Sequence, residues 1–338
     1  MIIESLFKST FEYNENFRYF CLKNCVKQLL NYHKVDHALA YLNCAPCMHV
    51  IIKEKLSSGY AIWFNKNPLL DIFMDCFTTH DPKIKTSAHN FPDIIHKIDC
   101  GVPVIASTDV FYLPYKKNYY LKHHASHALI IGGYDDSQKQ LYIVDYYDQD
   151  KYQGTLSYKD FFDSWSSANP SEENPFSGYA INNVWSVLHT VPSFENVANI
   201  VKITMDRAIS NFFGKDVTYG FRGIEGLMRL KNWLNDDISA NGSTNIGFLH
   251  KSLYMYYREK ILFFHYFKSL GQHLGKAYND ILYFMDNNIT KWNIFLTFLL
   301  KTNIAKMHID RIKLDRFYLN ILESEFHLYS CLVKSIKG

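Results

Sequence analysis

Three residues that lie far apart in the sequence have the side-chain types of a nucleophilic triad: Cys21, His127 and Asp145. His127 begins an apolar run at 127–134, and Asp145 lies near the end of the next run, at 140–147. The short polar turn between the two runs predicts a pair of neighbouring strands, which would bring the imidazole and the carboxylate together. In such a pair the carboxylate orients the imidazole, and the imidazole takes the proton of a nucleophile.

The best candidate for the nucleophile is Cys21. Residues 21–32 carry apolar side chains at a helical spacing, which predicts a helix whose first turn contains this cysteine. The unpaired amides and the dipole at a helix N-terminus stabilise a thiolate. The alternative interpretation is that Cys21, like Cys25 one turn further along, is a small buried hydrophobic residue. His123 and His124 are weaker candidates for the base, because they precede the apolar run and are expected to face solvent.

Helical and extended patterns alternate in a way that indicates an α+β protein. An amphipathic helix is predicted at 91–100, and short strands bounded by Gly, Asp, Asn or Pro follow, among them 102–110 and 182–190. From Pro192 onward the apolar period is helical to the end. The order Cys, His, Asp along the chain is that of papain-like folds. We therefore predict a papain-like catalytic domain at residues 1–190, with an N-terminal helix and an antiparallel sheet, and an all-α domain at 191–338.

Composition excludes several classes of function. The net charge of +3 is too small to predict nucleic-acid binding, and the longest apolar runs fall far short of the roughly 20 residues that cross a bilayer. The N-terminus shows no secretory signal, so we expect a cytoplasmic protein that contacts neither membrane nor nucleic acid and keeps its seven cysteines reduced. The chain has no P-loop or other glycine-rich phosphate motif, and we expect no cofactor of its own.

The motif Cys44-Ala-Pro-Cys47 with His49 could be half of a metal site or a redox dithiol. A structural zinc needs four ligands, and no second motif with suitable spacing follows. We interpret the segment as an ordinary loop and expect no bound metal.

Downstream of Cys21 the chain carries a series of short motifs: Gly101-Val-Pro-Val-Ile105, Leu113-Pro-Tyr115, His127-Ala128, Gly133-Tyr-Asp-Asp136 and Asp145. Together with Cys21 they resemble the N-terminal domain of butirosin biosynthesis protein H and its relatives, over about residues 15–190. The resemblance implies a fold similar to that of papain-like cysteine peptidases but a different chemistry, acyl transfer. In that chemistry a carrier-protein thioester acylates the cysteine, and an amine then collects the acyl group as an amide. Papain-like amide synthases of polythioamide (closthioamide) biosynthesis are similar enzymes.

The resemblance places Cys21 as the nucleophile, His127 as the base and Asp145 as the orienting carboxylate. It also places Asp109 and Tyr115 at the substrate, with Asp109 as a carboxylate that binds the amine. The partners it implies are an acyl or peptidyl carrier protein, whose phosphopantetheine holds the donor thioester, and a small amine.

The sequence departs from the family pattern beside the nucleophile. Phe20 precedes the cysteine where many relatives have histidine, and the glutamine that papain-type enzymes use as an oxyanion donor is absent. Asn14 and Asn16 are the available amides, and we expect Asn16 to supply the donor. Two alternatives stay open: a cysteine peptidase or thioester hydrolase with the same triad, and a non-catalytic binding module. The basic cluster Lys116-Lys117 with Lys122 could meet an acidic carrier protein, although a short charge run is usually a solvated loop.

Overall fold

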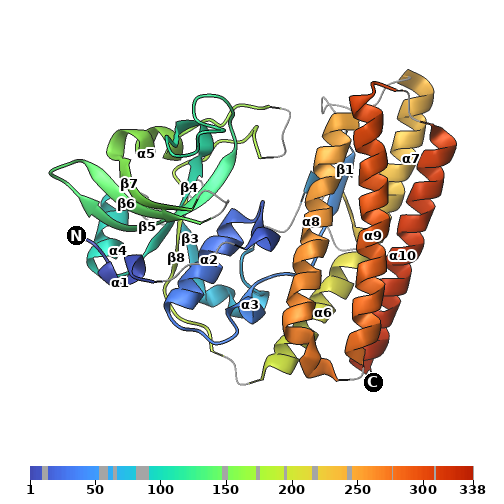
Figure 1. The fold of residues 1–338 in the computed structure, drawn as a ribbon, viewed down its shortest axis with the longest axis horizontal. Coiled ribbons are helices and arrows are strands. Elements are labelled where there is room, and N and C mark those ends of the chain that lie inside the picture. Colours follow the sequence, from blue (N-terminus) through green and yellow to red (C-terminus); the bar gives the residue numbers. More distant parts are fainter. Residues whose placement is uncertain are drawn as a thin grey trace. The chain divides into compact units, whose positions relative to one another are not determined.

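The chain forms two compact units, each described here by itself (Figure 1). Unit 1 consists of Met1–Asn43 and Asn67–Phe194, and unit 2 consists of Cys44–Lys66 and Glu195–Gly338. The computed structural model describes residues 1–9, 14–52, 60–63, 67–80, 91–146, 151–172, 176–193, 196–214, 220–241, 246–275, 277–307 and 310–337. The unit that holds the candidate triad therefore omits residues 44–66, which group with the helices of the C-terminal part. The domain boundary at 190 stays a prediction.

Unit 1 is built on a six-stranded antiparallel sheet of order β3-β8-β4-β5-β6-β7. Its central strands are nearly continuous apolar sequences, as expected for strands that are covered on both faces. The strands are β3 Phe77–His80, β4 Val104–Asp109, β5 Ser126–Asp135, β6 Gln140–Asp145, β7 Tyr152–Ser157 and β8 Trp185–Leu188.

Short helices surround this sheet, and α2, Cys21–Tyr32, packs against β5 (Figure 1). One face of α2 carries Val26, Leu29 and Leu30, which are completely or almost completely buried. The other helices of unit 1 are α1 Glu4–Phe7, η1 Glu15–Phe17, α3 Ala38–Tyr41, η2 Asp71–Cys76, α4 Phe91–Asp99, η3 Val110–Tyr112 and α5 Tyr158–Trp165.

The N-terminal segment fixes the middle of β5. Ile3 donates its backbone N–H to the carbonyl of Gly132 at 2.8 Å, and Ile2 pairs with Gly133. A Cβ atom at Gly133 would lie 2.8 Å from the backbone carbonyl oxygen of Met1, so the close approach requires glycine at this position. The strand that carries His127 is thus held from outside the sheet as well as by its neighbours.

Unit 2 combines a small sheet of order β2-β1-β9 with long helices. Its core is apolar and includes Trp292, Phe295 and Leu253, all completely buried. Figure 1 shows α8, α9 and α10 side by side. The elements are β1 His49–Ile52, β2 Tyr60–Trp63, β9 Phe221–Arg222, α6 Val197–Phe213, α7 Gly223–Asn241, α8 Ile246–Leu270, η4 Gly271–Leu274, α9 Ala277–Ile304 and α10 Arg311–Lys337.

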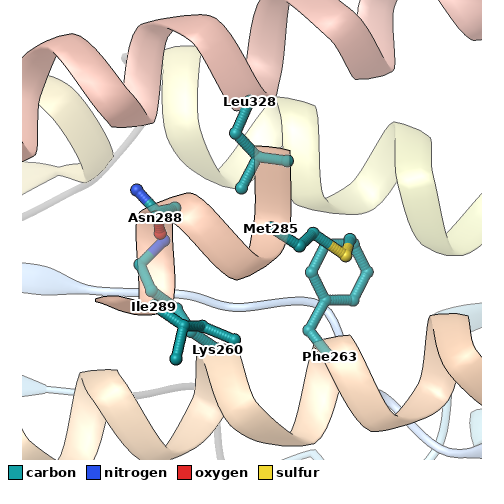
Figure 2. A pocket seen from close by; sticks show the side chains of 6 residues that line it. All are labelled: Lys260, Phe263, Met285, Asn288, Ile289 and Leu328. Carbon is teal, nitrogen blue, oxygen red and sulfur yellow. The ribbon is translucent and has the colours of Figure 1, made fainter. Parts of the chain in front are cut away.

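A small cavity lies among the helices of unit 2, lined by six side chains (Figure 2). Its volume is about 10 Å³, whereas one water molecule needs roughly 10–15 Å³. The space is therefore far too small for an acyl chain or an amine. The lining residues are Lys260, Phe263, Met285, Asn288, Ile289 and Leu328.

The predicted α+β class is confirmed, with an antiparallel sheet in the N-terminal part and helices in the C-terminal part. Helix α2 begins at Cys21 as predicted, and β5 and β6 form the predicted hairpin. Residue 147, at the end of the run predicted at 140–147, lies outside the described residues. Within the described ranges, no helix combines the length and the apolar character needed to cross a membrane.

Candidate active site

The hairpin of β5 and β6 brings His127 and Asp145 together. His127 is the second residue of β5, and Asp145 is the last residue of β6, so both lie at the same end of the hairpin. His127 Nε2 is 2.8 Å from Asp145 Oδ2, and both side chains are almost completely buried. This distance is that of a charge-assisted hydrogen bond, which fixes the plane of the imidazole and leaves Nδ1 as the nitrogen for another partner.

Helix α2 brings Cys21 to the same place. Cys21 lies in the first turn and is partly exposed, and a hydrogen bond joins its side chain to His127. One turn deeper, the Cys25 thiol donates to the carbonyl of Ala128 at 3.5 Å and is 5% exposed. Cys21 and Cys25 are four residues apart and therefore lie on the same face of the helix. The hydrogen bond from Cys25 to Ala128 thus directs this face toward β5, where His127 directly precedes Ala128.

A buried asparagine anchors the same helix to the other strand. Asn24 donates its side-chain amide to the carbonyl of Tyr146 at 3.1 Å, directly after Asp145. Helix α2 is therefore bonded to both strands of the hairpin, one contact beside His127 and one beside Asp145. The thiol, the imidazole and the carboxylate come together because three separate elements are held in register.

The charges in the site favour a protonated imidazole near neutral pH. Burial alone would lower the pKa of His127, but the Asp145 carboxylate and the hydrogen bond to Cys21 outweigh it and raise this pKa to about 9. Burial alone would raise the pKa of Asp145, but the positive charges of His127 and Lys116 hold it below its usual value. The Asp145 carboxylate therefore helps to keep a proton on the ring that contacts Cys21.

Asp145 has two further partners that come from the segment after β4. Lys116 Nζ is 3.0 Å from Asp145 Oδ2, and both side chains are buried, 6% and 1% exposed. Tyr115 donates its hydroxyl to the same oxygen at 3.0 Å, and its ring stacks on Tyr152 of β7. A single carboxylate oxygen of Asp145 therefore takes hydrogen bonds from His127 and Tyr115 and forms an ion pair with the Lys116 ammonium.

The structure thus separates Lys116 from Lys117 and Lys122, although the three lysines were predicted to form one basic cluster. Lys117 and Lys122 are exposed, whereas Lys116 is buried against Asp145. Charge alone could not separate these three residues. The available signal was position, because Lys116 directly follows the Leu-Pro-Tyr segment that was expected near the site.

Asp109 lies in the neighbouring strand with all its acceptor positions in use. Its carboxylate accepts the backbone N–H groups of Phe111 and Ala125 at 3.1 Å and the hydroxyl of Ser167 at 2.7 Å, and it is 2.7 Å from His124 Nδ1. The side chain is completely buried. A carboxylate offers about four lone-pair positions, so the geometry favours a structural role for Asp109. Its contact with an amine stays a prediction.

His124 was expected in solvent but is mostly buried. Its side chain is 16% exposed and stacks on Phe111, with ring centroids 4.1 Å apart. The carboxylate of Asp109, buried at the end of β4, accounts for the difference, since it offers the ring a partner away from water.

The candidate oxyanion donors lie just before Cys21. Asn16 is in η1 and partly exposed, and its backbone N–H donates to the Asn14 side chain at 2.9 Å. A helix leaves its first N–H groups without partners inside the helix, which makes the amide of Cys21 a second candidate donor. Tyr179 lies close to Cys21 as well, because the two side chains interact electrostatically. The Tyr179 hydroxyl is hydrogen-bonded to Ser126, the residue before His127.

Cys44 and Cys47 are buried thiols in unit 2. Cys47 donates its backbone N–H to Glu259 Oε2 at 2.7 Å, so the motif is tied to helix α8. Among the residues that the structure describes, no three His, Cys, Asp or Glu side chains are grouped to hold a metal ion.

Comparison with known proteins agrees with the predicted resemblance. Residues 20–146 match the family model described as butirosin biosynthesis protein H, N-terminal, which confirms for this segment the resemblance predicted from the motifs. The matched segment starts one residue before Cys21 and ends one residue after Asp145, so it contains all three residues of the candidate triad. The search of curated proteins found no match.

Proposed function

From a segment that matches this biosynthetic family and carries a thiol, an imidazole and a carboxylate in contact, we propose that the chain is an acyltransferase that forms amides. The acyl group moves from a thioester on the phosphopantetheine of a carrier protein to Cys21, and from Cys21 to a small amine. The observation that carries the proposal is the 2.8 Å contact between His127 and Asp145, with Cys21 hydrogen-bonded to the same imidazole.

The first half-reaction acylates the enzyme. The Cys21 thiolate attacks the carbonyl carbon of the donor thioester, and the backbone amide of Cys21 together with the Asn16 side chain holds the oxyanion. The bond from the carbonyl carbon to the phosphopantetheine sulfur then breaks. The leaving thiolate takes the proton of the His127 imidazolium, so the acyl-enzyme contains a neutral imidazole.

The second half-reaction forms the amide. A neutral amine attacks the acyl-enzyme and gives a proton to His127, and the bond from the carbonyl carbon to the Cys21 sulfur breaks. This step releases the amide and restores the pair of thiolate and imidazolium. The thioester already supplies the activation, so the reaction needs no ATP. Transfer prevails over hydrolysis where a bound amine has a high effective concentration relative to water.

The chemistry is tested by intact-protein mass spectrometry with a carrier-bound acyl thioester. We expect the wild-type protein to gain the mass of the acyl group and to lose it as an amide when a diamine is added. Cys21→Ala should not be acylated, whereas Cys100→Ala, which removes an exposed thiol directly after α4, should behave as the wild type. Release of the free acid in the presence of saturating amine would identify a thioester hydrolase instead. Acylation of Cys21→Ala would refute the role of this residue.

A further inference from the structure

The described residues around the triad include one buried cation that the proposed chemistry has not used, Lys116. Its ammonium is 3.0 Å from Asp145 Oδ2, the oxygen that also accepts from His127 at 2.8 Å. Its side chain is 6% exposed, although lysine is almost never buried unless it is paired. Removing an ammonium from water is costly, so a simple solvated loop does not explain this placement.

The charge balance of the acyl-enzyme indicates what the Lys116 ammonium does. Once Cys21 is acylated, no thiolate remains beside His127, and the ring must be neutral to take the proton of the amine. A carboxylate 2.8 Å away favours the protonated ring and works against this step. Lys116 is the one charge among the described partners of Asp145 that opposes protonation of His127, and its effect on the pKa of His127 is downward.

We propose that Lys116 is a positioning residue of the site, whose ammonium both holds Asp145 in line with His127 and offsets part of the carboxylate charge, which favours the neutral imidazole that the amine needs. The inference deepens the proposed function and rests on it for the identity of the proton that His127 accepts. The charge effect itself is a property of the folded protein and can be measured without any acyl donor.

Other titratable groups lie in the site or next to its members, but they differ from Lys116 in kind. None of them carries a positive charge, so none can take over the role. They are Cys21 and Cys25 of α2, Tyr115 of the segment after β4, Asp145 of β6, Tyr152 of β7 and Tyr179 of the loop after α5.

The test follows the titration of the His127 ring by NMR in Cys21→Ala protein with selectively labelled histidine. In this background no thiol titrates against the ring, and His127→Gln identifies its signal. We expect Lys116→Met to raise the titration midpoint by ~1 pH unit or more, because a charge a few ångströms away is removed from a buried site. Lys116→Arg keeps the charge and should leave the midpoint within ~0.3 pH units.

Two more variants make the result decisive. Lys116→Gln keeps a donor for Asp145 but has no charge, so it should raise the midpoint as Lys116→Met does. Lys117→Met removes the exposed neighbouring charge and should leave the midpoint unchanged. A midpoint that stays or falls in folded Lys116→Met or Lys116→Gln protein overturns the inference. If the midpoint rises but no amide is formed from any carrier-bound thioester, the charge role stands and the proposed acyl transfer fails.

Discussion

Asp145→Asn is the sharpest test of the electrostatics of the site. The substitution keeps the size of the side chain but removes the charge that holds a proton on His127. Without it, burial and Lys116 both act to lower the pKa of His127, from about 9 to its ordinary value of 6.5 or below. This change corresponds to about 3 kcal/mol, or on the order of 100-fold in the equilibrium that forms the thiolate and imidazolium pair.

The assay is alkylation of Cys21 by iodoacetamide at pH 6 to 7, followed by peptide mass spectrometry. In this range an ordinary thiol is mostly protonated and slow, whereas a thiolate paired with imidazolium reacts. We expect Cys21 of the wild type to react faster than exposed Cys100, and the Asp145→Asn variant to lose roughly 100-fold at Cys21. The rate at Cys100 should not change, which makes this residue an internal control.

Stability must be separated from reactivity in this experiment. Asp145→Asn leaves the buried Lys116 without its counter-charge, which costs about 3–5 kcal/mol in comparable sites. The double variant Asp145→Asn, Lys116→Met removes the stranded charge and should recover much of that stability without recovering the reactivity of Cys21. Equal alkylation rates of Cys21 in the wild type and the folded double variant would refute our account of the ion pair.

Three further predictions concern His127, the hydrogen bond between Asn24 and Tyr146, and a buried ion pair of unit 2. The raised pKa of His127 stabilises the folded state fully below pH 6.5, and this contribution is lost as the pH rises through about 9. The melting temperature of His127→Gln should therefore depend less on pH between 6.5 and 9 than that of the wild type. The same pH dependence of the melting temperature in both proteins would contradict this prediction. Asn24→Ala removes the bond to the Tyr146 carbonyl and should lower the free energy of unfolding by about 1–3 kcal/mol in urea titrations, whereas a neutral effect would show that this anchor is dispensable. In unit 2, Lys260 Nζ is 2.7 Å from Glu325 Oε1, so Lys260→Met leaves a buried carboxylate without its counter-charge. The free energy of unfolding, measured by calorimetry, should fall by about 3–5 kcal/mol. The double variant Lys260→Met, Glu325→Leu should recover most of this loss.

Local patterns were sufficient for the elements that carry the triad. The helical spacing after Cys21, the turn between two apolar runs and the glycine after the helix at 91–99 are signals within a few residues of each other. Gly101 has a φ of +76°, in the left-handed region that glycine adopts readily, and it lies two residues after the end of α4 at Asp99. Such features depend on neighbours in the sequence and can be read from it.

The partners of buried charges could not be read in the same way. Lys116 was grouped with two exposed lysines, and His124 was expected in solvent, because a charged residue on a polar segment is usually solvated. Each has a carboxylate partner that lies 15 or more residues away in the sequence. Only the packing of the segment after β4 on the sheet decides which of these charges is buried.

Residue types and their order along the chain determined the class of fold, the family of the segment around Cys21 and the identity of the candidate triad. The tertiary structure alone decided that Asp145 is hydrogen-bonded to His127 and Tyr115 and paired with Lys116, and that Asp109 is fully engaged by its own chain. The physical reason is that helix and strand periodicity are local properties of the backbone. The state of a buried ionisable group depends instead on every charge within a few ångströms, and those charges come from distant parts of the sequence.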